Sequence, residues 1–229
     1  YEIYLYNCIS VLFNEQKRFR EAIEYSDKAE SKAIAINDTI ERLSAHANKG
    51  AILMRQGNYR KSVNSLTSMW NMVKQTNYNV LTLKYLSPLL KSYLQLGKAD
   101  SVAFYLTYAN DACRNLAPTS NGVLGILEIK ADLLGLQKKY AEQWLLLDSI
   151  GRLAGTNLTM PKDKLLATQA RCLNNMGKYT QAYQAMQKAY MKSDSLKQSD
   201  IDKQLSEFNI KYKTCLLYTS PSPRDAHES

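Results

Sequence analysis

The chain has 229 residues, of which 45% are apolar and 22% are charged, and its formal net charge is +9 at pH 7. This is the composition of an ordinary globular protein with enough apolar residues for a sizeable core. No run of about 18 consecutive apolar residues occurs, so no segment is suited to span a membrane as a helix. The 30 Lys and Arg residues are interleaved with Asp and Glu, so we expect solvated helix faces, with binding to nucleic acid or acidic surfaces as the weaker alternative.

Five segments of the sequence repeat at an interval of about 40 residues. They are EQKRFREAIEYSDKA, MRQGNYRKSVNSLTSM, LQLGKADSVAFYLTYA, LGLQKKYAEQWLLLDSI and NNMGKYTQAYQAMQKA. Their anchor positions, 40, 40, 41 and 39 residues apart, are Phe19, Tyr59, Ala99, Tyr140 and Tyr179. Mostly small residues follow three positions later, at Ala22, Ser62, Val102, Gln143 and Ala182. Further small or apolar residues keep to the same helical face, so each segment predicts an amphipathic helix.

Another helical pattern precedes each of these segments. Its apolar stripes are Ile9/Leu12/Phe13, Gly50/Ile52/Leu53, Leu86/Leu89/Leu90/Tyr93/Leu94, Leu127/Ala131/Leu134 and Leu166/Ala170/Leu173. Gly57, Gly97 and Gly177 stand where this first helix must end, because glycine adopts a positive φ at little cost. Pro88 lies inside its stripe and predicts either a kink or a helix that begins after Ser87. Because no segment alternates with a period of two, the sequence predicts ten α-helices in five antiparallel pairs.

The turn and the residues after it resemble the tetratricopeptide repeat (TPR). The pattern G-N-Y-x-x-S begins at Gly57, and G-K-Y-x-x-A begins at Gly177. The resemblance covers residues 1–195 and is weakest where Ala99 replaces the aromatic anchor and Gln143 the small residue. It implies a right-handed α-solenoid of about five TPR-like pairs with a concave inner wall. We attribute the period of about 40, longer than the usual 34, to longer second helices and linkers.

The segment 196–214 follows the fifth pair and carries a different period. Ile201, Leu205, Phe208 and Tyr212 are spaced by 4, 3 and 4 residues and are flanked by polar side chains. This spacing is typical of a coiled-coil seam, although it extends over only two heptads. A helix that caps the fifth pair explains the pattern equally well. We therefore expect either a solenoid cap or the start of a coiled-coil stalk, which would join two copies in a homodimer.

The last residues, 215–229, do not continue this pattern. The run CLLYTSPSPRD contains two prolines within three residues, and its reverse translation resembles a transposase adapter used in sequencing libraries, read in frame. The resemblance implies that this tail is not native and that the natural sequence is interrupted near Thr214. A Ser/Pro-rich linker is the alternative. We expect the chain from about Thr219 onward to be irregular and exposed.

The repeats together with the junction Y-M-K-S-D-S-L…I-x-x-x-L-S-E-F-x-x-K-Y resemble the sensory region of Bacteroidota-type signalling proteins. In that family a coiled-coil stalk, usually a membrane helix, and a histidine kinase or helix-turn-helix output domain follow the repeats. The resemblance implies a ligand- or partner-binding sensor array of a truncated two-component-type protein, with a membrane helix downstream. It favours a periplasmic location, with the cytoplasm as the other option. The alternative function is a free-standing TPR scaffold for protein–protein interactions.

The sequence offers little catalytic chemistry. It has no phosphate-binding glycine loop and no His or Cys pair at metal-ligand spacing. His46 is the one histidine outside the tail, and we expect it to be a packing or surface residue. Glu128 and Asp132, four residues apart, would fit an acid–base pair, but carboxylates on a solvated inner wall are the commoner case. We therefore expect no enzymatic activity, no cofactor and no metal site in this chain.

Binding is the function that the pattern favours. The face of each first helix opposite its apolar stripe should line the concave groove, and its polar side chains would bind the backbone or carboxylates of a protein or peptide ligand. These candidate groove residues are Asn7, Asn14, Asn48, Arg55, Lys84, Lys91, Glu128, Asp132, Lys164, Arg171, Asn174 and Asn175.

Overall fold

The structure, a computed structural model, describes residues 1–154, 162–189 and 191. The expected cap or stalk at 196–214 and the tail at 215–229 lie outside the described residues. Every regular element in the described part is a helix, which confirms the all-α prediction. In chain order these are α1 (Glu2–Glu15), α2 (Phe19–Ala35), α3 (Thr39–Arg55), α4 (Tyr59–Ser68), α5 (Trp70–Gln75), α6 (Asn79–Gln95), α7 (Ala99–Cys113), α8 (Asn121–Leu136), α9 (Tyr140–Ala154), α10 (Lys162–Asn175) and a helical stretch at 179–189. None of the helices within these ranges is long and apolar enough to cross a membrane.

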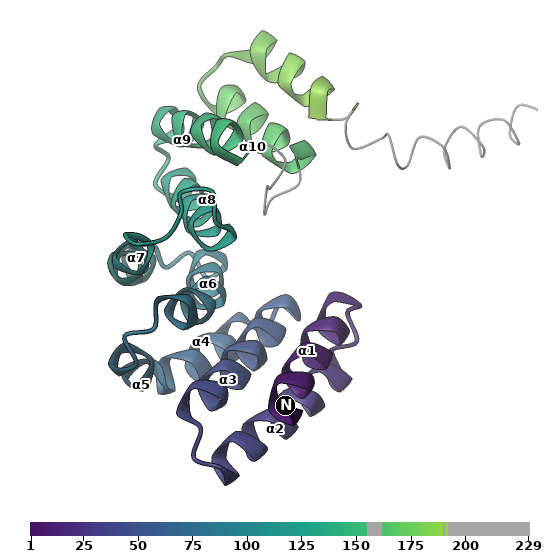
Figure 1. Ribbon diagram of the computed structural model, residues 1–229. Coiled ribbons are helices and arrows are strands. Elements are labelled where there is room, and N and C mark those ends of the chain that lie inside the picture. The colour runs from purple at the N-terminus through teal and green to yellow at the C-terminus, as the bar shows by residue number, and fades with distance from the viewer. Residues whose placement is uncertain (155–161, 190, 192–229) are drawn as a thin grey trace, which may run out of the picture.

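The helices form pairs that stack side by side into an open arc (Figure 1). α1 packs with α2, α3 lies against both of them, α6 lies against α3 and α4, and α8 lies against α6 and α7. α6 and α8 are on the inner side of the arc, whereas α5 and α7 are on its outer side (Figure 1). The first helix of each pair therefore lines the concave surface, which is the arrangement of a helical-repeat solenoid.

The second helices begin at the anchor positions that the repeat predicts. α2, α4, α7 and α9 start at Phe19, Tyr59, Ala99 and Tyr140, and the last helical stretch starts at residue 179. The residue three positions later is buried in all five units, with exposed fractions of 0 to 7%. Close approach of two helices is easiest where a small residue stands at the contact. Three of the five are Ala or Ser, and even Gln143 is buried at this position.

The turns within the pairs share one backbone conformation. Gly57, Gly97 and Gly177 have φ values of 79°, 68° and 75°, which confirms their predicted role at the ends of the first helices. Lys17 and Lys138 occupy the same position, two residues before the anchor, with φ values of 60° and 61°. A side chain at such a φ is strained because its β-carbon approaches the following carbonyl oxygen. The first and fourth turns thus adopt the repeat's geometry without its glycine.

The second helix of the second pair is divided into α4 and α5, whereas the repeat predicts one continuous helix. The break falls at Met69. Just before it, the Thr67 hydroxyl donates to the Val63 carbonyl at 2.8 Å and the Ser68 hydroxyl donates to the Ser65 carbonyl at 2.6 Å. Side-chain hydroxyls that bond to carbonyls of the preceding turn compete with the backbone ladder and bend helices. The run of hydroxyl residues explains the break.

Two further expectations about the first helices are corrected. α6 begins at Asn79 and continues through the buried Pro88, so the proposed start after Ser87 is wrong. The expected stripe of α1 is also wrong at Leu12, which is 60% exposed. α1 instead buries Ile3, Asn7, Ser10 and Asn14. Two of the three buried polar side chains have hydrogen-bond partners: the Ser10 hydroxyl donates to the Ala22 carbonyl at 2.8 Å, and the Asn7 amide donates to Glu41.

Candidate functional site

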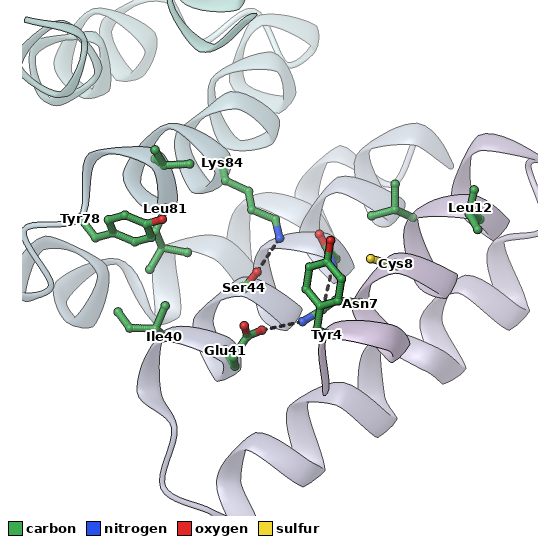
Figure 2. A pocket seen from close by; sticks show the side chains of 13 residues that line it. Tyr4, Asn7, Cys8, Leu12, Ile40, Glu41, Ser44, Tyr78, Leu81 and Lys84 are labelled. Carbon is green, nitrogen blue, oxygen red and sulfur yellow. Dashed lines mark hydrogen bonds between the residues drawn. The ribbon is translucent and has the colours of Figure 1, made fainter. Parts of the chain in front are cut away.

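A pocket of about 570 Å³ opens on the concave surface between the first helices of three consecutive pairs (Figure 2). α1 contributes one wall, α3 the base and α6 the opposite wall. The lining residues are Tyr4, Asn7, Cys8, Val11 and Leu12 of α1, Ile40, Glu41, Ser44 and Asn48 of α3, and Val80, Leu81 and Lys84 of α6 together with Tyr78 just before it. This groove pocket has the size and the mostly apolar lining typical of ligand sites.

Three polar side chains form a connected network in the groove pocket. The amide of Asn7 donates to Glu41 Oε2 at 3.0 Å, and the amide of Asn48 donates to Asn7 Oδ1 at 2.9 Å (Figure 2). Asn7 and Asn48 are only 7% and 6% exposed. Glu41 lies in the first turn of α3, where Asp38 caps the helix by accepting the Glu41 N–H at 3.0 Å. The network fixes its own side chains and holds α1 against α3.

Lys84 brings a positive charge to the wall opposite α1. Its ammonium donates to the Ser44 hydroxyl at 2.5 Å (Figure 2). Although the residue as a whole is solvent-accessible, the pKa of Lys84 is lowered from its ordinary value, because desolvation by the surrounding helices outweighs the attraction of Glu41. No carboxylate in the described part of the chain forms an ion pair with Lys84. The pocket therefore offers a desolvated cation.

The rim of the groove pocket is apolar, which the sequence prediction missed. Its exposed side chains are Tyr4 (68%), Leu12 (60%), Val80 (54%), Tyr78 (48%), Val11 (43%) and Ile40 (39%). The sequence predicts only polar groove residues and places Leu12 in the packing stripe. The sequence did contain a sign of this rim. α1 is apolar on most of its circumference, and one packing stripe does not use all of these apolar residues.

The groove continues beyond Lys84 towards the middle of the arc. A neighbouring pocket of about 430 Å³ lies between α6 and α8 and shares Val80 and Lys84 with the groove pocket. Beyond this second pocket, the carboxyl of Asp132 interacts electrostatically with four other predicted groove residues, Lys164, Glu128, Lys91 and Arg171. The pKa of Asp132 is raised, first by desolvation and also by Glu128, while the three cations oppose the rise. The structure thus brings five of the predicted residues into one charged cluster on α6, α8 and α10.

The remaining predicted groove residues lie outside the groove pocket and the charged cluster. Arg55 forms an ion pair with Glu15 at 2.7 Å and so links α3 to α1. Asn14 is 8% exposed and its Oδ1 has no hydrogen-bond partner among the described residues, so it is a packing residue and not an open groove position. Asn174 lines a pocket of about 390 Å³ between α10 and the stretch at 179–189. Asn175 is exposed.

His46 takes part in a half-buried polar contact between helices. His46 Nε2 lies 3.0 Å from the Ser65 carbonyl and 3.1 Å from the Ser65 hydroxyl, and Nδ1 lies 3.4 Å from Glu30. The His46 ring also stacks on Tyr85. The order Ser–His–Glu is that of a nucleophile, a base and an orienting acid. However, the backbone donors of α4 are used in the helix, and Ser65 lines none of the pockets described above. His46 is therefore a packing residue, as expected.

No protein-family model matches the chain, and no curated protein matches it in sequence. Among solved structures, the chain is similar to two crystal structures of a putative kinesin light chain with nearly identical TPR-like repeats from Podosopora anserina. One, a variant, aligns with a TM-score of 0.64 at 12% identity over 86% of this chain and 96% of that chain. The other aligns with a TM-score of 0.62 at 12% identity over 85% and 96%. The chain has a TPR-like fold. At this identity the likeness concerns the fold alone.

Proposed function

We propose that the chain is a binding protein whose concave groove holds a segment of a partner protein. The observation that carries this proposal is the groove pocket, in which exposed apolar side chains surround the Asn48–Asn7–Glu41 network and the Lys84 ammonium. Apolar side chains exposed together on a concave surface are typical of interaction sites. The proposal includes no catalytic step, because the described polar side chains of the groove hold one another and the helices.

The two adjoining pockets indicate the kind of segment that would fit. Val80 and Lys84 separate the groove pocket from the neighbouring pocket and belong to both. An extended peptide that crosses this ridge would place one apolar side chain in each pocket. Lys84 would then meet a peptide carbonyl or carboxylate, which replaces the water lost from the ammonium.

A selection of phage-displayed random 12-residue peptides on the whole chain tests this proposal. We expect the selected peptides to carry spaced apolar residues and to bind the V80D variant at least tenfold more weakly in fluorescence anisotropy. The control is L145D, because Leu145 of α9 is 59% exposed and lines neither of these pockets. Peptides that bind V80D and the unaltered chain equally well would show that the groove is not the site.

A more specific role is that of a sensor array in a signal-transduction protein. It is supported by the resemblance of the junction around Ile201 to Tyr212, which lies outside the described residues. A coiled-coil stalk, a downstream membrane helix and a periplasmic location belong to this proposal. The genomic sequence beyond the codon for Thr214 tests it: an open reading frame into a stalk and an output domain supports a sensor. A stop codon within a few residues favours the free-standing scaffold instead.

A further inference from the structure

The outer face of α1 is apolar, and none of the described helices covers it. Leu5 and Leu12, seven residues apart and thus on one side of the helix, are 55% and 60% exposed. Tyr1 extends the same line of side chains and is fully exposed. Leu12 also borders the groove pocket, whereas Leu5 does not. A surface helix normally presents polar residues on such a face, and terminal units of solenoids need a polar outer face to remain soluble.

In the other units of the repeat, the residues equivalent to Leu5 and Leu12 are buried. The positions equivalent to Leu5 are Ala45, Tyr85, Ile126 and Leu165, and their exposed fractions range from 0 to 5%. The positions equivalent to Leu12 are Ile52, Ser92, Leu133 and Cys172, with exposed fractions of 0 to 7%. All eight are buried because a preceding pair of helices covers the first helix of each later unit. The same face of α1 has no such neighbour in the described structure.

The contact between α2 and α3 shows how the cover is made. Ala45 of α3 packs against Ala29 and Ala33 of α2, and the Ser26 hydroxyl donates to the Ala45 carbonyl at 2.7 Å. In the next unit the covering helices accommodate a much larger side chain, Tyr85, which is completely buried. The covering unit thus accepts an alanine at this position in one case and a tyrosine in the next, so a leucine of intermediate size would also fit.

We propose that the outer face of α1 docks one further helix pair of the same repeat type, stacked on α1 as each unit of the chain stacks on the next. This partner surface adjoins the concave groove at Leu12 but faces away from it at Leu5, and it goes beyond the proposed function. Its chemistry is specified by the repeat: the docking pair presents a shallow apolar channel to Leu5 and Leu12. A second copy that pairs α1 with α1 is the competing occupant, and it lacks the four precedents that the chain itself provides.

The test is a tandem fusion that places a copy of residues 39–80 directly before Tyr1. This copy contains the helices that cover Tyr85 in the native chain, and the junction keeps the register of the repeat, because Tyr1 is equivalent to Leu81. We expect the fusion to raise the Tm of the whole chain by about 5 °C or more, because neighbour interfaces contribute directly to the stability of repeat arrays. Amide hydrogen exchange in α1 should slow at the same time.

Leu5→Asp together with Leu12→Asp separates docking from folding. In the unfused chain the double variant should change the Tm by about 2 °C or less, since both side chains are exposed. In the fusion it should abolish the gain in Tm and the slower exchange of α1. A fusion that leaves the Tm and the α1 exchange unchanged overturns the proposal. So does an unfused chain that sediments as a dimer and becomes a monomer with the two substitutions, because the face then binds a second copy. V80D, which disables the groove, should leave the gain in Tm intact.

Discussion

Gly50 of α3 lies directly beneath the side chain of Leu66 of α4, so that a β-carbon added at Gly50 would stand 2.4 Å from Leu66 Cδ2. The absence of a side chain therefore sets how closely the two helices of the second pair approach. The carbonyl of Gly50 also accepts the Ser62 hydroxyl at 2.8 Å across this contact. Ser62 is completely buried, and it is the small residue that the repeat predicts at this position.

Gly50→Ala should therefore destabilise the chain, although alanine is the better helix former. We expect the free energy of unfolding to fall by about 1–3 kcal/mol, as is usual for overpacking of a core contact. Gly125 of α8 is the matched control, because nothing lies within 4 Å of a β-carbon built there. Gly125→Ala should raise the stability by about 0.5–1 kcal/mol. Urea titrations of both variants measure the difference, and a stabilising G50A would contradict the close contact.

Lys138 offers a gain in stability at the turn between α8 and α9. Its φ of 61° costs a non-glycine residue about 1–2 kcal/mol, whereas glycine adopts this conformation freely. Glycine also gives the unfolded chain more conformational entropy, which offsets part of the relief of strain. We therefore expect Lys138→Gly to increase the free energy of unfolding by about 0.5–1 kcal/mol. Lys130→Gly makes the same chemical change inside α8 and should instead cost about 1 kcal/mol. Equal effects of the two substitutions on the Tm would show that the turn is not strained.

Tyr85 is completely buried, and its hydroxyl has no hydrogen-bond partner among the described residues. Burial also raises the pKa of Tyr85. A buried hydroxyl without a partner costs about 1–3 kcal/mol, so Tyr85→Phe should increase the free energy of unfolding by about 1 kcal/mol. Tyr105→Phe serves as the control, because the Tyr105 hydroxyl has Tyr93 as a partner. Thermal melts that show a loss of stability for Y85F would reveal a partner for the hydroxyl.

The desolvated Lys84 predicts a pH-dependent cost in stability. Its pKa in the folded chain lies below the ordinary value of 10.5, so the unfolded chain binds more protons between the two values and stability rises with pH across this window. Below this window the full cost is present, and Lys84→Met should make the chain more stable there. The advantage of K84M should shrink as the pH approaches 10.5. Urea titrations between pH 7 and 10.5 test this, with Lys130→Met as the exposed control; a gap that is constant with pH would contradict the desolvation of Lys84.

The anchors and turns could be predicted from the sequence because they depend on neighbours in the chain. Gly57 and Gly97 satisfy a local need for positive φ, and the helices that follow start at Tyr59 and Ala99 as predicted. The division of the second helix at Met69 was missed, because the competing bonds of Thr67 and Ser68 are not visible in a pattern of apolar residues. A hydroxyl in a helix either bonds back to the preceding turn or points to solvent, and its surroundings decide which.

The candidate site was predicted in part. Asn7, Asn48 and Lys84 do line the groove pocket, since the period of the first helices places them on the inner side of the arc. The apolar rim was missed, and with it the exposure of Leu12. The residue type alone does not tell whether a leucine faces a neighbouring unit, the groove or solvent.

The sequence by itself thus determined the repeat: its period, its turns and the small residues at which paired helices touch, all of which follow from contacts within about 40 residues. Only the tertiary structure decided which faces are covered. Ala45 and Leu5 occupy equivalent positions, yet one is buried and the other is 55% exposed, because α3 has a preceding helix pair against it and α1 has none in the described structure. Burial in a solenoid depends on the neighbouring unit, and the curvature produced by stacking places residues from three such units in one pocket.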